Sequence, residues 1–166
     1  MIELRRMSEV DEATVLAFEL ENRAYFAQSI SDRGDEFFEQ YSREHRNQLA
    51  EQEAGTCVFH VLVDSDSAVV GRVNLYDVRE GAADLGYRLA QRVTGRGVAS
   101  EAVTRVIQLA RDVYGLSALK AVVSDTNVGS KRVLEKTGFN VTGPAEINGR
   151  PASRYELDLT AGRGPW

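Results

Sequence analysis

Hydrophobic and polar positions in the first third of the chain predict one short strand followed by two helices. Residues 2–5 read as the strand, and Ser8 with Asp11 resembles the polar start of a helix. The apolar positions that follow share one helical stripe: Ala13, Leu16, Ala17 and Leu20. Residues 35–53 predict the second helix, and its stripe is spaced at three and four: Phe38, Tyr41, His45 and Leu49.

The pattern then changes to the alternation of strands. Alternate residues of 57–63 share one face, and residues 68–78 form the second strand of the same hairpin, after a polar turn at 64–67. Gly81 indicates another turn, and residues 83–89 predict a third strand. This region therefore predicts antiparallel hairpins.

A helical period returns after Gly95-Arg96-Gly97 and ends at Gly115. The stripe of this long helix is Ala99, Val103, Val106, Ile107 and Ala110. The apolar run 119–123 predicts a buried strand. The remaining elements are a short helix and two strands joined by a turn at Asn148-Gly149, over residues 127–137, 139–147 and 155–159.

The order of elements predicts an α/β (α+β) fold with a mixed, mostly antiparallel sheet. The strand–helix–strand unit around residues 83–123 favours one parallel pair, because such connections join adjacent parallel strands. We expect helices on both faces of the sheet. The length of 166 residues suits one domain over 1–160, followed by a tail at 161–166.

Composition narrows the classes of function. No apolar run approaches the ~20 residues that cross a bilayer, so we expect no membrane partner. Residues 1–6 have no apolar h-region, so we expect no signal peptide. Cys57 is the single cysteine, which excludes an internal disulfide framework and a cysteine-built zinc site and favours a cytoplasmic location. The net charge of −5, without a Lys/Arg block, argues against nucleic-acid binding.

The segment 92–100 lies between a strand and a helix and predicts an anion cradle. Gly95 and Gly97 let successive N–H groups point inward, and the helix start adds unsatisfied N–H groups and partial positive charge. Arg92 and Arg96 add formal charge. We expect a phosphate or pyrophosphate here, while a glycine turn without any ligand stays open from the glycines alone.

Two nucleotide-binding motifs fit this segment poorly. A P-loop requires a Gly-Lys-Ser/Thr ending, which the chain lacks. A dinucleotide loop requires a third Gly or Ala where Ser100 stands, and an acid about 20 residues later, where Leu119 and Lys120 stand.

The wider pattern resembles the RimJ/RimL branch of the GNAT superfamily of N-acetyltransferases over essentially the whole chain. The motifs that carry the resemblance follow the family order: acidic-x-Gly-Tyr at 84–87, Arg-x-x-Gly-x-Gly at 92–97, Asn-x-x-Ser at 127–130 with Gly138-Phe139, and Asn148-Gly149-Arg150.

The resemblance implies a sheet splayed between its fourth and fifth strands, with acetyl-CoA as co-substrate and no metal. It also implies an amine acceptor, either the α-amine of a protein N-terminus, often a ribosomal protein, or a small molecule. Dimers are common in this branch, and the oligomeric state stays open. The alternative is a GNAT-fold module that binds acyl-CoA and catalyses little.

By this resemblance the pyrophosphate contacts Arg92, Gly95, Arg96, Gly97, Val98, Ala99 and Ser100, mostly through backbone N–H groups. Main-chain groups of 87–89, Tyr87 and Leu89 among them, would lie along the pantetheine. Asn127 would form hydrogen bonds with the amides of the pantetheine and would also cap the short helix that it begins.

Two residues are catalytic candidates. Asp84 is the proposed general base, acting through water because aspartate is shorter than the glutamate common at this position. Ser130 is the proposed donor to the departing thiolate. Many GNAT enzymes use a tyrosine for this step, and Leu134 occupies its position here. A solvated strand residue remains the alternative for Asp84.

Overall fold

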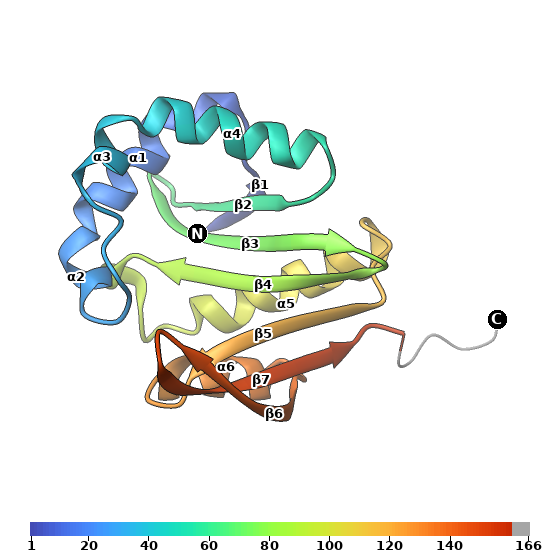
Figure 1. Ribbon diagram of the computed structural model, residues 1–166. Coiled ribbons are helices and arrows are strands. Elements are labelled where there is room, and N and C mark those ends of the chain that lie inside the picture. The colour runs from blue at the N-terminus through green and yellow to red at the C-terminus, as the bar shows by residue number, and fades with distance from the viewer. Residues whose placement is uncertain (161–166) are drawn as a thin grey trace. The chain divides into compact units, whose positions relative to one another are not determined.

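Seven strands form one mixed sheet in the computed structural model, which describes residues 1–160. Their hydrogen-bonded order is β1-β2-β3-β4-β5-β7-β6. Figure 1 shows them as arrows, with these bounds: β1 Glu3–Arg6, β2 Val58–Val63, β3 Val69–Arg79, β4 Ala82–Leu89, β5 Ala118–Ser124, β6 Asn140–Ile147 and β7 Arg150–Asp158. The predicted tail at 161–166 lies outside the described residues.

Pairing confirms the predicted mixed topology. β1 pairs with β2, β5 with β7 and β6 with β7, all antiparallel, whereas β4 and β5 are parallel. The register between β4 and β5 joins 82–84 to 118–120, so it uses only the first three residues of each strand. This short register agrees with strands that part after their first residues, as the resemblance implies.

The helices flank the sheet, and several differ from the predicted ranges. They are α1 Glu12–Glu21, α2 Arg23–Ala27, α3 Asp35–Glu39, α4 Tyr41–Glu53, α5 Val98–Asp112 and α6 Val128–Lys136, with short 3-10 turns η1 Glu9–Asp11 and η2 Gln91–Val93. The predicted helix over 35–53 is therefore two helices, interrupted at Gln40 (φ −110°, ψ 26°).

The chain forms two compact units. Unit 1 comprises 1–74 and 87–96, and unit 2 comprises 75–86 and, of the described residues, 97–160. β3 and β4 contribute residues to both units.

In unit 1, α4 lies along β2 (Figure 1). The side chain of Gln52 joins the two, since its Oε1 accepts from the Phe59 N–H at 2.9 Å and its Nε2 donates to the Met7 carbonyl at 3.0 Å. β2 is buried on both faces rather than alternating, because helices and strands of this unit cover it.

The predicted stripe of the first helix is wrong. Ala13, Ala17 and Leu20 are exposed, and the buried face of α1 is formed by Val15, Phe18 and Glu19, with Asn22 after its end. This face has the same spacing of three and four, rotated around the helix. The sequence did not reveal this buried face, because two of its residues, Glu19 and Asn22, are polar whereas the exposed face is more apolar.

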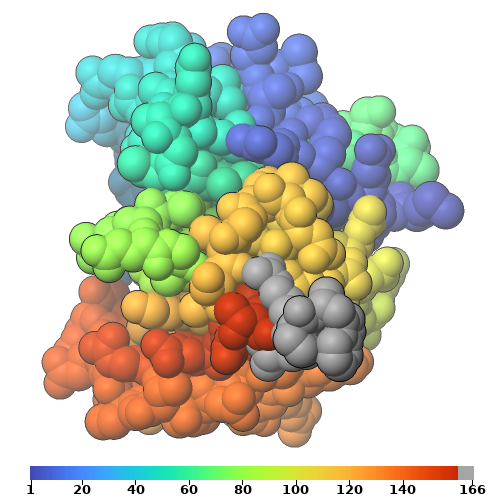
Figure 2. Space-filling model, turned by 90° about the vertical axis from the view of Figure 1, so that its right-hand side faces the viewer, coloured from blue at the N-terminus to red at the C-terminus, as the bar shows by residue number. Residues whose placement is uncertain are grey.

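Unit 2 packs α5 and α6 with β5, β6 and β7 around its own core. The stripe of α5 is confirmed at Val103, Val106 and Ala110. The predicted buried strand β5 instead alternates, with Val122 exposed. The segment that follows α5, yellow to light orange in Figure 2, lies at the surface.

Local turns follow their sequence signals closely. Asn148 and Gly149 both have positive φ, 51° and 77°, as the predicted two-residue hairpin turn requires. The 64–67 turn is held by Asp64, whose Oδ1 accepts from the N–H groups of Asp66 and Ala68 at 2.9 and 3.0 Å.

Candidate functional site

The two glycines of the predicted anion cradle adopt the left-handed conformation. Gly95 has φ 75° and Gly97 has φ 76°, and a Cβ at either position would meet no heavy atom within 4 Å. Packing therefore does not require glycine at these positions; the backbone conformation does, and the missing side chains leave the backbone open to a ligand.

The start of α5 supplies the N–H groups that such a cradle needs. Its first backbone hydrogen bond runs from the Glu101 N–H to the Gly97 carbonyl at 3.1 Å. The N–H groups of Val98, Ala99 and Ser100 precede it and have no acceptor within the helix. Together with the positive end of the helix dipole, they favour an anion at this end of unit 2.

The stretch before the glycines is fixed onto unit 1. The Ala90 N–H donates to the Val70 carbonyl at 2.8 Å, and the Gln91 N–H donates to Asn22 Oδ1 at 3.0 Å. Thr94 closes the short η2 turn by donating its N–H and its hydroxyl to the Gln91 carbonyl. A buried polar side chain from the end of α1 thus sets where the loop begins.

The Arg92 side chain lies against carboxylates. Its Nη2 is 3.0 Å from Asp64 Oδ2 and its Nε is 4.0 Å from Glu21 Oε1. Hydrogen bonds from the Ala68 N–H and from Arg92 lower the pKa of Asp64, so this partner is ionised at neutral pH. The coenzyme would have to share Arg92 with Asp64, whereas Arg96 is exposed.

Residues in the middle of β4 alternate between buried and exposed positions. Ala83 and Leu85 are buried, while Asp84 between them is exposed and lies opposite Lys120 of β5. Gly86 follows on the side of Asp84, and a Cβ there would come within 3.2 Å of the Tyr76 ring. The glycine of the acidic-x-Gly-Tyr motif therefore makes room for that ring.

The end of β4 belongs to unit 1 and lies close to β3. A Cβ on Gly71 would come within 2.7 Å of Leu89 Cδ2 and 3.1 Å of the Arg88 carbonyl. Tyr87 and Leu89 are both half-buried. Gly71 therefore lets β4 approach closely, and this contact fixes the backbone predicted to lie along the pantetheine.

Asn127 and Ser130 are brought together as the helix cap of α6. Asn127 Oδ1 accepts from the Ser130 N–H at 3.1 Å, so the capping role is confirmed and its amide nitrogen points away from that bond. Leu134, at the position of the usual tyrosine, is 1% exposed and belongs to the core of unit 2. It supplies no acid.

Both histidines are structural in unit 1. His60 is fully buried, its Nδ1 lies 2.9 Å from the Val73 carbonyl, and burial lowers its pKa to about 4. His45 is buried beside the Ser8 carbonyl, 3.1 Å from its Nε2. Neither has the exposure that a general base needs.

Sequence reasoning missed a charged cluster in unit 1. Glu19 of α1, 2% exposed, receives Arg88 Nη2 at 2.8 Å and lies 4.0 Å from Nη1 of the buried Arg72. Arg72 Nη2 also donates to Gln48 Oε1 at 2.9 Å. The signals were a charged residue inside the apolar run 69–73 and an acid on the helical face shared with Phe18.

The described residues contain neither a metal-type cluster nor a membrane-spanning helix. Within 1–160, no three His, Cys, Asp or Glu side chains gather in the manner of a metal site. No helix in the same range has the length and apolar character to span a membrane.

Comparisons with known proteins identify the family of the chain. A family model for an acetyltransferase (GNAT) domain matches residues 2–140. The probable N-acetyltransferase YjcK of Bacillus subtilis (strain 168) is 33% identical over 155 residues, which cover 89% of this chain and 84% of that protein.

Solved structures share the fold. Ribosomal-protein-S5-alanine acetyltransferase from Vibrio fischeri superposes with a TM-score of 0.90 at 22% identity, covering 96% of this chain and 94% of that one. Spermidine N-acetyltransferase from Vibrio cholerae, in complex with CoA and spermine, gives a TM-score of 0.79 at 17% identity and covers 96% of each chain. The chain thus belongs to the GNAT family of acetyl-CoA-dependent N-acetyltransferases.

Proposed function

We propose that this protein transfers the acetyl group of acetyl-CoA to a primary amine by direct attack in a ternary complex. The observation that carries the proposal is the left-handed pair Gly95 and Gly97 at the start of α5, where three N–H groups lack an acceptor within the helix. A pyrophosphate is an anion of the charge and shape that such a cradle binds.

The reaction sets three requirements on the site. The amine must be neutral when it attacks, and an α-amine with a pKa near ~8 loses its proton more easily than a lysine side chain near ~10.4. The thioester oxygen gains negative charge and needs donors. The thiolate then leaves, and its protonation helps only modestly because a thiol pKa is about 8.5.

We assign residues of each unit, taken by itself, to these requirements. In unit 1, an N–H of the 87–89 segment polarises the carbonyl, and Arg92 with Arg96 supports the pyrophosphate. In unit 2, Asp84 takes the amine proton through water, since it is exposed and its neighbours Ala83 and Leu85 hold the strand in place. Ser130 donates to the thiolate directly or through water.

The acceptor is a protein N-terminal α-amine or a small amine. The similar Vibrio fischeri enzyme is named for alanine acetylation of a ribosomal protein, and the Vibrio cholerae enzyme for spermidine. Both chemistries begin with the same neutral primary amine, so the coenzyme half of the site suits either.

Two observations favour a second candidate, a module that binds acyl-CoA with little or no catalysis. Leu134 is buried at the position of the usual tyrosine, and Asp84 is an aspartate where a glutamate is common. Such a protein would bind the coenzyme with no turnover of any amine.

Release of free CoA thiol, measured with a panel of amines, separates these candidates. We expect turnover by the wild type, a fall in kcat of about tenfold or more for Asp84→Asn, consistent with loss of a general base, and a smaller fall for Ser130→Ala. Acetyl-CoA affinity should persist in both variants. Unchanged turnover in Asp84→Asn would remove its catalytic assignment, and turnover by no amine would favour the binding module.

A further inference from the structure

A pocket within unit 1 lies next to the segment assigned to the pantetheine. It is small and partly open to solvent, with a cavity volume of about 10 Å³, roughly the space of one water molecule. α1, α2, the segment 30–33, α3 and β4 all contribute to its lining, with Glu19, Arg23, Phe26, Asp32, Arg33 and Arg88 among the lining residues.

Arg88 connects this pocket to the reaction. It stands between Tyr87 and Leu89, and successive side chains of a strand point to opposite faces. Its guanidinium therefore lies on the other face of the strand from those two side chains, one residue from the main chain proposed to polarise the thioester. A molecule held by Arg88 lies close to that part of the strand.

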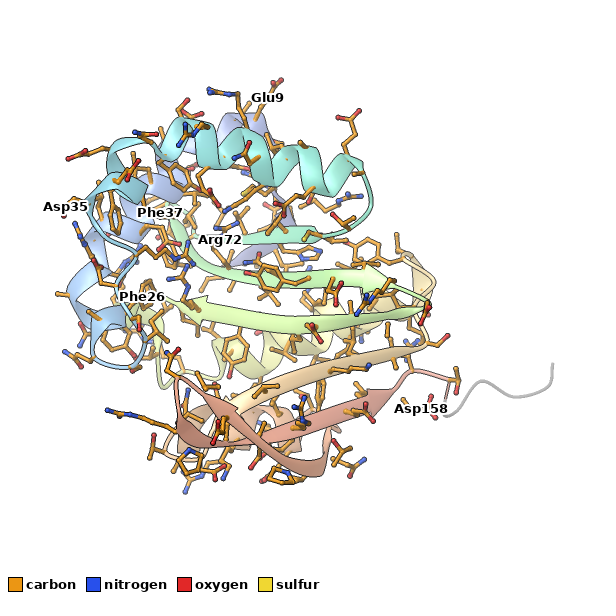
Figure 3. All side chains as sticks on the ribbon, viewed as in Figure 1. Glu9, Phe26, Asp35, Phe37, Arg72 and Asp158 are labelled. Atoms are coloured by element: carbon orange, nitrogen blue, oxygen red, sulfur yellow. The ribbon has the colours of Figure 1, made fainter. Side chains whose placement is uncertain are left out.

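Aromatic rings orient the guanidinium groups of the pocket. Arg88 Cζ is 4.9 Å from the Phe26 ring centroid, Arg23 Cζ is 4.2 Å from that of Phe38, and Arg33 Cζ is 4.6 Å from that of Phe37. A guanidinium stacked on a ring keeps its N–H edge available for an anion. Figure 3 shows Phe26, Phe37 and Arg72 at the same end of unit 1.

The acids of the pocket are already engaged by arginines. Asp32 and Asp35 both bind Arg23 at 2.8 Å, and the buried Glu19 is shared by Arg88 and Arg72. A polyamine would need carboxylates that are free to pair with its ammonium groups. This pocket offers none that is not already paired, among the residues that the structure describes.

One arginine of the pocket has no acidic partner. Among residues 1–160, Arg33 has no carboxylate within 4.0 Å, whereas Arg23 and Arg88 each have at least one. The Arg33 guanidinium therefore keeps charge and donors that no carboxylate uses, and an anion is the group that binds them.

We propose that this pocket binds a carboxylate of the acceptor, so that the enzyme prefers primary amines that carry an acidic group over polyamines. Arg33 and Arg88 are the specificity-determining residues, and the phenyl rings provide an apolar wall beside the carboxylate. The carboxylate comes from a free amino acid or from an acidic side chain close to the N-terminus of a peptide. The proposal rests on the proposed acetyl transfer.

Binding of reaction products tests the pocket without depending on turnover. The probes are the N-acetylated dipeptide amides acetyl-Ala-Asp-amide and acetyl-Ala-Asn-amide, and acetyl-alanine with its own amide, titrated by calorimetry into protein saturated with CoA. We expect each acid to bind about tenfold or more tighter than its uncharged partner, as for a charge-assisted hydrogen bond. The pair with the larger ratio identifies the source of the carboxylate.

Variants then locate the effect. Arg33→Gln, whose side chain lies at the surface, should bring the ratio of acid to amide close to one. Arg88→Gln alone would leave buried Glu19 short of a partner and so destabilise the fold, and the paired variant Glu19→Gln with Arg88→Gln is therefore measured beside it. Arg111→Gln in unit 2 is the matched control, and it should keep the wild-type ratio.

Kinetics give the second readout. With acetyl-CoA saturating, Ala-Asp-amide should have a higher kcat/KM than Ala-Asn-amide, and spermidine should have the lowest. Equal binding of acids and amides, or spermidine as the best acceptor, would overturn this inference. If acetyl-CoA still bound in that case, the proposed acetyl transfer would stand; loss of acetyl-CoA binding would instead count against the transfer itself.

Discussion

At the scale of single residues, the candidate site depends on partners that are distant in sequence. Asn22 accepts a hydrogen bond from the Gln91 N–H, and Asp64 forms an ion pair with the Arg92 guanidinium. The motifs indicated that residues 92–100 form a ligand loop, but no local pattern connects that loop to the end of α1 or to the turn after β2. Partners of this kind become visible only when the chain is folded.

Asp64→Asn should raise the affinity for acetyl-CoA by a few-fold. Asparagine keeps the Oδ1 that accepts from Asp66 and Ala68, so the turn persists, but it releases the charge of Arg92 for the pyrophosphate. Calorimetry measures the change. The control is a double-mutant cycle with Arg92→Gln, in which Asp64→Asn should add nothing. An equal gain in both backgrounds would exclude Arg92 as the cause.

His60 should make the free energy of unfolding depend on pH between about 4 and 6.5. Burial lowers its pKa in the folded state to about 4, so the unfolded chain binds the extra proton and stability falls as the pH drops through this window. The full effect is on the order of 3 kcal/mol. Below about pH 4, His60 causes no further decrease in the free energy of unfolding.

His60→Asn provides the comparison for this pH dependence. The amide nitrogen of asparagine can donate to the Val73 carbonyl as Nδ1 does, but it does not titrate. Denaturant titrations at several pH values should give a flatter dependence for the variant than for the wild type. Identical slopes would mean that other groups cause the change.

At the scale of elements, the sequence predicted type and order better than it predicted faces. Glycines placed the starts and ends of α5 and the turns correctly, since their positive φ is a local requirement. The stripe of α1 was wrong because Glu19 and Asn22 face the core for their polar contacts. The break at Gln40 was missed because residues 35–53 carry no proline or glycine to indicate it.

Gly97→Asp should weaken acetyl-CoA binding severely while unit 2 stays folded. An aspartate at φ 76° costs roughly 1 kcal/mol in backbone strain, and it places a negative charge beside the pyrophosphate. Gly115→Asp is the matched control, because its φ is 67° and a Cβ there also meets nothing within 4 Å. It lies past the opposite end of α5 and should bind acetyl-CoA like the parent.

Equal coenzyme affinity in the two aspartate variants would contradict the assignment of 95–100 to the pyrophosphate. Circular dichroism and thermal melts should show a similar, small loss of stability in both, since the backbone penalty is the same.

At the scale of the whole molecule, the order of helices and strands predicted the fold class, the mixed sheet and the parallel pair of β4 and β5. What the sequence did not indicate is which residues pair in the cluster of Glu19, Arg72 and Arg88, since the pairs join residues up to 69 positions apart. Such long-range pairing follows from packing, and no local motif indicates it. The coenzyme was therefore predictable from local motifs, whereas the pocket proposed for the acceptor was not.

Calorimetry of the purified protein with acetyl-CoA, with NAD and ATP as controls, tests the central claim most directly. We expect acetyl-CoA to bind with a Kd of about micromolar, a free energy near −8 kcal/mol, and neither control to bind. Binding of NAD or ATP without binding of acetyl-CoA would contradict the assignment of the Gly95–Gly97 loop and the acetyl transfer that depends on it.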